Sequence, residues 1–136
     1  MAKIDAAKMW SLNYRVLTSV ITSVAPEIEQ LGLEVKGLFL LAEVEAHPHP
    51  AELAAVLLMP KPTVTLIMKR LEAAGFLRRE IDRVDLRRHR LTVTPSGRKA
   101  VTRGLALLSE AYGKRLDRLS DSEQKALYQL LEALSR

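Results

Sequence analysis

The 136-residue sequence contains no cysteine and few aromatic residues, and both shortages narrow the classes of protein that it can encode. Without cysteine the chain can form neither a disulfide, nor a thiolate metal site, nor a thiol redox switch. Aromatic residues make up 4% of the sequence, and its apolar content is mostly leucine, alanine and valine, which favours helices. Long apolar runs and the basic, apolar start of a signal peptide are also missing. We therefore expect a cytoplasmic protein that does not enter a membrane.

Positive charge is concentrated in one part of the sequence. The formal net charge is +5, but residues 61–103 contain twelve Lys or Arg and only four Asp or Glu, so the remainder is slightly acidic. A basic block on a neutral to acidic body is typical of proteins that bind polyanions. Membrane-surface binding would instead predict a basic helix with a strong apolar face, whereas turn and strand signals interrupt this block. The distribution favours nucleic acid as a partner.

Apolar residues at spacings of three and four predict a series of helices. Pro26 and Gly32 are expected to interrupt the chain after the first helix, and Gly75 is expected to end the fourth. Thr94 and Pro95 suit the start of a long helix, and Ser120 with Glu123 forms a capping box for the last one. The helices are predicted over residues 4–24, 35–46, 51–58, 62–74, 95–119 and 120–134.

Residues 77–94, LRREIDRVDLRRHRLTVT, hold six arginines and neither glycine nor proline. His89, Leu91 and Val93 alternate with polar residues, as in a half-buried strand. Residues 77–81 can pair with this strand, which leaves residues 83–88 as the tip of a hairpin. Two short helices with a tight turn, followed by a hairpin, describe a winged helix-turn-helix. We therefore predict a mainly α fold with a small β-hairpin.

In such a fold the second short helix lies in the major groove of DNA, where base edges can be distinguished. Lysine and threonine near its N-terminus suit phosphate and base contacts, and arginine at the hairpin tip can follow a narrow minor groove. The predicted DNA-contacting residues are Lys61, Pro62, Thr63, Thr65, Leu66, Lys69, Arg70, Arg83, Asp85, Arg87 and Arg88.

The chain resembles the MarR (multiple antibiotic resistance regulator) family of bacterial transcription factors. Two segments carry the resemblance, ELAAVLLMPKPTVTLIMKRLEAAGFLRRE and DLRRHRLTVTPSG. The resemblance covers residues 33–97, and its most specific part is Asp85-x-Arg87, twelve residues before Gly97. It implies a winged helix-turn-helix in residues 33–94 and an obligate homodimer formed by helices in residues 1–32 and 95–136. It also implies that Arg87 enters the minor groove while Asp85 braces the wing, which is the hairpin of residues 77–93.

Many members of this family bind small aromatic or phenolic compounds between the DNA-binding and dimerisation parts, which lowers their affinity for DNA. The resemblance therefore implies a homodimeric repressor on a palindromic operator, with an aromatic effector at Trp10, Tyr14 and Phe39. The alternative for these three aromatic residues, and for Tyr112, is an ordinary place in the core.

Catalysis and metal binding are not indicated. An enzyme needs an assembled nucleophile, base and oxyanion site, or a metal ion. The sequence has no glycine-rich phosphate loop, no paired-histidine zinc motif and no nucleophile elbow, so we expect neither an enzyme nor a bound cofactor. His47 and His49 lie beside prolines in a predicted loop, and two ligands alone do not make a metal site. His89 is expected to be half-buried in its strand.

A second class of function is a winged-helix protein-interaction module without specific DNA binding. Such a module would expose an apolar recognition helix, which Leu66 supports and the basic hairpin opposes. For the arginines of the hairpin, the corresponding alternative is a solvated strand surface that pairs in part with Glu80, Asp82 and Asp85.

Overall fold

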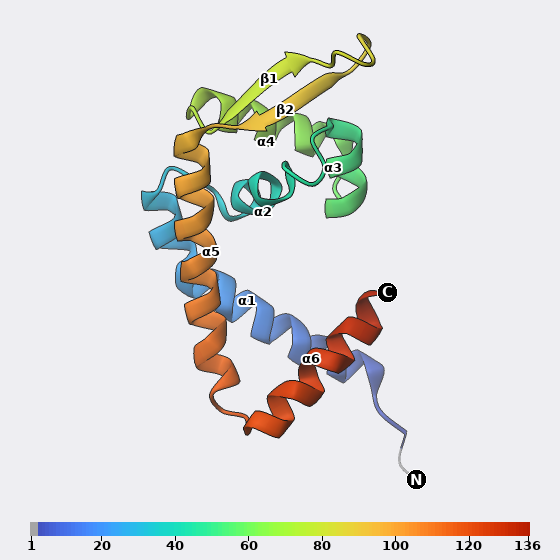
Figure 1. Cartoon of the computed structure of the whole chain (residues 1–136). Helices are drawn as coiled ribbons and strands as arrows, with labels where there is room; N and C mark the ends of the chain where they lie inside the picture. The colour runs from blue at the N-terminus through green and yellow to red at the C-terminus, as the bar shows by residue number, and fades with distance from the viewer. Residues whose placement is uncertain (1–2) are drawn as a thin grey trace. The chain divides into compact units, whose positions relative to one another are not determined.

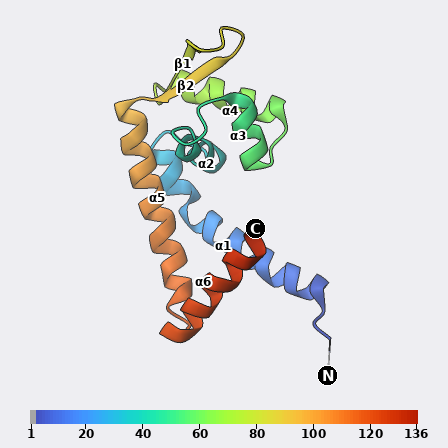
Figure 2. The same cartoon turned by 45° about the vertical axis from the view of Figure 1, so that its right-hand side comes forward.

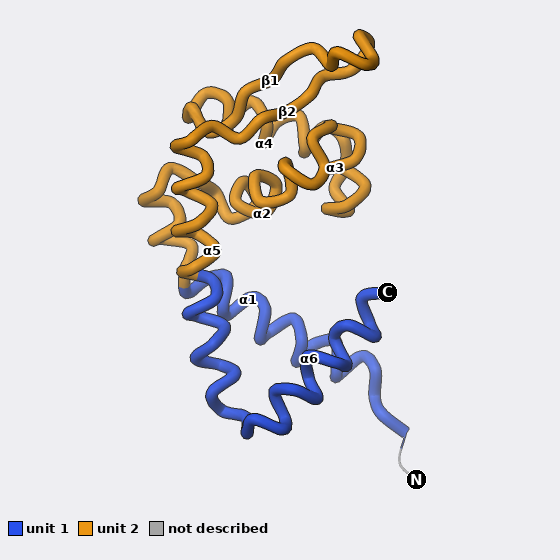
Figure 3. The backbone as a smooth tube through the Cα atoms, in the orientation of Figure 1, with its two compact units in different colours: residues 1–23, 108–136 blue, residues 24–107 orange. Residues whose placement is uncertain are grey.

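The computed structural model describes residues 3–136, and the chain divides into two compact units (Figure 3). The winged-helix unit comprises residues 24–107, and the helical unit comprises residues 1–23 and 108–136. The elements are, in chain order, α1 (Ala6–Gln30), α2 (Val35–Glu43), α3 (Pro50–Leu57), α4 (Lys61–Ala73), β1 (Leu77–Ile81), β2 (His89–Val93), α5 (Pro95–Leu116) and α6 (Asp121–Ser135) (Figure 1).

The apolar stripe predicted for the fourth helix is the central part of the core of the winged-helix unit. Val64, Ile67, Met68 and Leu71 of α4 are each no more than 6% exposed. Helix α4 contacts α2, α3 and β1, and these helices lie on one side of the hairpin in both views (Figures 1 and 2). Full burial of one such side chain contributes about 1.5–3 kcal/mol, so the stripe holds α4 firmly in place. The polar face of α4 is left at the surface.

The hairpin forms between the two segments that the sequence predicts. Its two strands are antiparallel, with Leu77 opposite Val93 at the base and Ile81 opposite His89 near the tip. Leu77, Leu91 and Val93 are buried, but His89 is exposed, so its predicted half-burial is wrong. The alternation of residues along a strand buries a side chain only where helices cover that face of the sheet. The outer end of the hairpin extends past them.

The Thr-Pro-Ser-Gly segment, residues 94–97, links the start of α5 to the turn after α4 by hydrogen bonds. The Thr94 hydroxyl donates to the Gly75 carbonyl at 2.6 Å and accepts from the Gly97 N–H at 3.0 Å, so it caps α5 and ties it to the turn after α4. Gly75 has φ +80°, which suits its predicted role as a helix stop. A Cβ atom on Gly97 would lie 2.3 Å from the Phe76 carbonyl oxygen. Only glycine therefore permits this close approach between α5 and the turn before β1.

The first helix is longer than predicted. It continues through Pro26 to Gln30 and ends just before Gly32, which has φ +87°. Proline removes one N–H from the helix ladder. The buried Val24 and Ile28 on either side of Pro26 anchor the helix to the core, and this packing outweighs the lost hydrogen bond. The second helix is shorter than predicted, because residues 44–46 form turns ahead of the proline-rich loop.

The turn between α3 and α4 contains a strained leucine. Leu58 has φ 53° and ψ 42°, a left-handed conformation that L-residues other than asparagine seldom adopt, and its side chain is 90% exposed. We expect Leu58→Gly to raise the free energy of unfolding by roughly 0.5–1 kcal/mol, because it relieves this strain without loss of buried surface. Urea denaturation measures the change. Leu58→Ala is the control and should leave stability unchanged, since it keeps the Cβ atom; a Gly variant no more stable than the Ala variant would contradict the argument.

The helical unit contains the first part of α1, the last part of α5 and all of α6. The predicted capping box is present, since the Glu123 N–H donates to the Ser120 hydroxyl and the Ser120 N–H donates to the Glu123 carboxylate. These bonds lower the pKa of Glu123 below its ordinary value. None of the residues of α6, all of which the structure describes, is buried. In residues 3–136 no single helix is long and apolar enough to cross a membrane, and the α3–α4 pair that approaches this composition is bent by 115°.

Candidate nucleic-acid interface

Helices α3 and α4 form a helix-turn-helix. The chain turns by 115° between them, within the range typical of this motif. On α3, the predicted inward residues Leu53 and Ala54 are buried and Leu57 is half-buried. Pro60 and Pro62 lie at the start of α4, where a missing N–H costs no helix hydrogen bond. The motif is therefore fixed by packing on one side and by proline at the turn.

The outer face of α4 carries the residues that the sequence assigns to DNA. Thr63 is half-buried, and the Thr65 hydroxyl donates to the Lys61 carbonyl at 3.0 Å. Leu66 is 50% exposed, in the middle of this face. Arg70 donates to the Glu34 carboxylate at 2.6 Å, so its charge is already paired within the chain. The exposed members of the set are Lys61, Pro62, Thr65, Leu66, Lys69 and Arg70.

At the tip of the hairpin, Asp85 holds Arg87 in place. Its Oδ1 atom accepts from the Arg87 backbone N–H at 3.0 Å and from the guanidinium Nε at 3.1 Å. The Arg87 side-chain bond and then its backbone N–H lower the pKa of Asp85 below its ordinary value, so the carboxylate stays ionised at neutral pH. The Arg87 side chain is nevertheless 91% exposed. Arg87 is thus oriented by its neighbour while its charge remains open to solvent.

Asp82, which the sequence suggested only as a surface ion-pair partner, organises the base of the tip. Its Oδ1 atom accepts from the backbone N–H groups of Val84 at 2.7 Å and Asp85 at 3.1 Å, and Arg88 Nε lies 3.4 Å from Oδ2. The N–H groups of Asp85 and Val84, helped by Arg88 and His49, lower the pKa of Asp82 below its ordinary value, although burial opposes this. Arg88 is therefore tied to the wing, whereas Arg83 is exposed beside it.

A second arginine ties the wing to the helices. Arg79 on β1 pairs with the Glu72 carboxylate on α4, with Nε at 3.1 Å from Oε1. Both side chains are about one-third exposed or less. This bond fixes the base of the hairpin against the end of α4.

His49 is buried beneath the wing, and within residues 3–136 no group of three or more His, Asp or Glu residues could hold a metal ion. Its Nε2 atom lies 3.4 Å from Asp82 Oδ2. His47, two residues earlier, is partly exposed and lies 3.8 Å from the Glu52 carboxylate. The two histidines therefore have different surroundings, which the sequence pattern could not distinguish.

The three residues assigned to an aromatic ligand fall in different units. Trp10 and Tyr14 belong to the helical unit, where their ring centroids lie 6.2 Å apart, and both are more than half exposed. Phe39, on α2 of the winged-helix unit, is half-buried. The alternative of a core position is wrong for Trp10 and Tyr14 in the single chain. The structure does not bring the three into one site within either unit.

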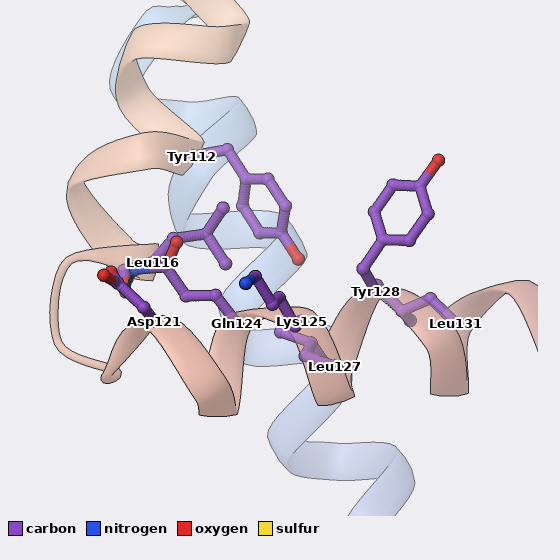
Figure 4. Close-up of a pocket in the computed structure, with 8 residues that line it drawn as sticks. All are labelled: Tyr112, Leu116, Asp121, Gln124, Lys125, Leu127, Tyr128 and Leu131. Atoms are coloured by element: carbon purple, nitrogen blue, oxygen red, sulfur yellow. Dashed lines mark hydrogen bonds between the residues drawn. The ribbon is translucent and has the colours of Figure 1, made fainter.

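The helical unit has an apolar groove of about 410 Å³ between α5 and α6. Tyr112 and Leu116 reach into it from α5, and Leu127, Tyr128 and Leu131 line it from α6 (Figure 4). Leu130 and Leu134 of α6 are also exposed.

Comparison with known proteins relates the DNA-binding segment to a family model. The model of the MarR family matches residues 32–88, which contain α2, α3, α4, β1 and the wing tip. A search among curated proteins returned no significant match.

The fold matches solved structures along nearly the whole chain. A probable transcriptional regulator from Pseudomonas aeruginosa is 26% identical, with 90% of this chain and 93% of that chain covered and a TM-score of 0.76. S. aureus MepR in complex with DNA is 23% identical, with 93% and 96% covered and a TM-score of 0.79. A mutant MarR from E. coli in complex with operator DNA is 18% identical, with 93% of each chain covered and a TM-score of 0.80. The chain thus has the predicted winged-helix fold, and its DNA-binding segment matches the model of the MarR family.

Proposed function

We propose that the chain is a sequence-specific DNA-binding transcription regulator that acts as a repressor and binds a palindromic operator as a homodimer. The observation that carries the DNA-binding part is the wing tip, where Asp85 orients an Arg87 whose side chain is 91% exposed. Arginine presented in this way suits a narrow minor groove, in which the negative potential is enhanced. The basic residues of α4 and the wing supply the phosphate contacts.

The polar start of α4 supports the placement of this helix in the major groove. Lys61, Thr65 and Lys69 are exposed on its outer face, and the buried stripe on the opposite side prevents it from rotating. Solved complexes of MepR and MarR with DNA have the same fold. Arg83, Arg87 and Arg88 add charge beside the groove. In this proposal Arg70 contributes less than its neighbours, since Glu34 already pairs with it.

The exposed apolar residues of α1 and α6 support the homodimer. They are Met9, Trp10, Leu12, Tyr14, Val16 and Leu17 of α1 with Tyr128, Leu130, Leu131 and Leu134 of α6, and together we call them the open apolar surface. Their exposed fractions range from 38% to 80% in the single chain. An amphipathic helix gains most of its stability from a covered apolar face, and α6 buries none of its described residues. A second copy of the chain, docked in the groove of Figure 4, would cover this surface in both protomers.

Selection of bound sequences from random double-stranded DNA tests the proposal directly. We expect an enriched palindrome whose half-sites lie about one helical turn, roughly 34 Å, apart. Gel shifts of the selected duplex at several salt concentrations should give a log–log slope of about −0.9 for each phosphate contact. Enrichment of a single half-site would overturn the dimer part of the proposal.

The exposed Leu66 favours one other function, a winged helix that docks on protein without specific DNA binding. The same gel shift separates the two functions, because such a module would show no preference between the selected duplex and random DNA. MarR-family proteins are transcription regulators, so the match of residues 32–88 to the model of this family opposes an enzymatic role.

We also propose that a small aromatic or phenolic ligand lowers DNA affinity, with Trp10, Tyr14 and Phe39 as candidate contacts. The Trp10 and Tyr14 rings, whose centroids lie 6.2 Å apart, offer two neighbouring aromatic contacts. A ligand shifts the equilibrium only by its difference in affinity for the DNA-competent and incompetent states, typically about 1–3 kcal/mol. We expect phenolic compounds such as salicylate, at millimolar concentration, to shift the Tm and to weaken operator binding. If neither quantity changes across such compounds, effector control of this class is ruled out.

A further inference from the structure

The segment before α3 is bonded to the wing, although some forty residues separate them in the sequence. The Pro48 carbonyl accepts the backbone N–H of Leu91 on β2 at 2.8 Å. His49 follows, and its own carbonyl accepts the Leu53 N–H in the first turn of α3 at 3.1 Å. This short segment is therefore attached to the hairpin on one side and to the helix-turn-helix on the other.

The His49 ring adds two side-chain contacts across the same boundary. Its Nδ1 atom lies 3.0 Å from the carbonyl oxygen of His89, and because a carbonyl only accepts, Nδ1 must carry the hydrogen. Its Nε2 atom faces Asp82 Oδ2 at 3.4 Å. The side chains of His49 and Asp82 are only 8% and 5% exposed. Water cannot readily replace the ring at this position, so the loss of the His49 side chain removes both contacts without substitution.

Asp82 connects this histidine to the charged tip. It receives the N–H groups of Val84 and Asp85 on Oδ1, its own N–H donates to the Arg88 carbonyl at 2.9 Å, and Arg88 Nε lies near Oδ2. Asp85 in turn holds Arg87. A continuous set of contacts therefore leads from the start of α3, through His49 and Asp82, to the exposed arginine.

We propose that His49 and Asp82 are positioning residues that fix the wing tip against the helix-turn-helix, so that Arg87 and α4 can engage DNA together. The DNA-binding part of this inference rests on the function proposed above. A protein with an unanchored tip would keep its charge and its fold, but Arg87 would sample many orientations before it bound DNA. Ordering this loose segment on binding costs conformational entropy, and this cost lowers the affinity for DNA.

The experiment compares His49→Ala, His49→Gln and His47→Ala in the full chain by two measurements. Amide hydrogen exchange of Val84, Asp85 and Leu91 reports the anchoring of the wing without any DNA. Titration with the selected duplex reports its consequence for binding. The glutamine variant places an amide nitrogen near the position of Nε2, close to Asp82, whereas the alanine variant leaves no polar group there. His47 is the matched control, because it lies in the same loop and its side chain is partly exposed.

We expect His49→Ala to speed exchange at these three amides and to weaken duplex binding about tenfold, roughly the effect of losing one buried hydrogen bond. His49→Gln should restore most of the exchange protection and most of the duplex affinity. His47→Ala should change neither of these quantities. Unchanged exchange in His49→Ala, no rescue by glutamine, or an equal effect of His47→Ala would overturn the proposal. Should His49→Ala not fold, the comparison of His49→Gln with His49→Asn, which keeps only the donor to His89, decides in its place. If the wild type shows no duplex binding, the proposed function fails, while the exchange data still decide on the anchoring.

Discussion

Leu131→Glu is expected to convert the proposed homodimer into monomers and to weaken operator binding by at least about 100-fold. Leu131 lines the groove between α5 and α6 and belongs to the open apolar surface. In an interface with twofold symmetry one substitution introduces two buried charges, one from each protomer. A monomer then binds a single half-site and loses the gain from simultaneous contacts, which is typically 10²–10⁴-fold.

Light scattering at micromolar concentration measures the mass of each variant. The only tryptophan of the chain, Trp10, gives an independent signal, because its exposed ring would be covered in the dimer and open to water in the variant. Leu58→Glu is the control, since it introduces the same charge at an exposed leucine of the winged-helix unit and should leave the dimer intact. A wild-type monomer, or a Leu131→Glu variant that stays dimeric, would show that this surface does not form the interface.

Asp85→Ala should weaken operator binding although it removes a negative charge close to DNA. Simple electrostatics predicts tighter binding, because one repulsive charge is lost. The structure favours the opposite sign, because the two bonds that orient Arg87 end on Asp85 Oδ1. Arg87→Ala should weaken operator binding by about 1–3 kcal/mol, with a smaller effect on random DNA. Arg88→Ala should weaken both and reduce the salt slope by about 0.9.

Titration of each variant against operator and random duplex at several salt concentrations measures these effects. Glu80→Ala provides the matched control, because it also removes a carboxylate from the wing but has no bond to Arg87. It lies opposite Arg90 in the ladder, and its removal should leave binding unchanged or slightly tighter. Tighter operator binding by the Asp85 variant would refute the bracing role, and unchanged affinity of Arg87→Ala would mean that the wing does not read DNA.

Local sequence patterns predicted most of the winged-helix unit. The buried stripe of α4 follows the helical period, and the two paired strands follow from alternation together with the turn signals. Prediction was wrong where tertiary packing overrides a local rule. Pro26 lies inside a helix that buried neighbours stabilise, and His89 continues an alternation beyond the point where helices cover the sheet.

The site could be predicted only where its residues are close in the sequence. Asp85 and Arg87 are two positions apart, so their pairing follows from the motif. The contact of His49 with Asp82 joins residues 33 positions apart, and no periodicity links a loop histidine to an aspartate beneath a hairpin. Arg70 illustrates the same limit, since its partner Glu34 is similarly distant and reduces the charge that the sequence assigns to the surface.

The structure of the wing tip also affects the susceptibility of the protein to proteolysis. Its exposed arginines form a series of trypsin sites, and Val84 and Leu86 between them are more than 75% exposed. A protease, however, needs an extended backbone, and the tip is closed by the N–H groups that Asp82 and Asp85 accept. Cleavage must therefore wait for a local opening of the tip, even though the rest of the fold stays intact. The rate of tryptic nicking at the wing would thus report the free energy of that opening, whereas susceptibility elsewhere reports the stability of the core.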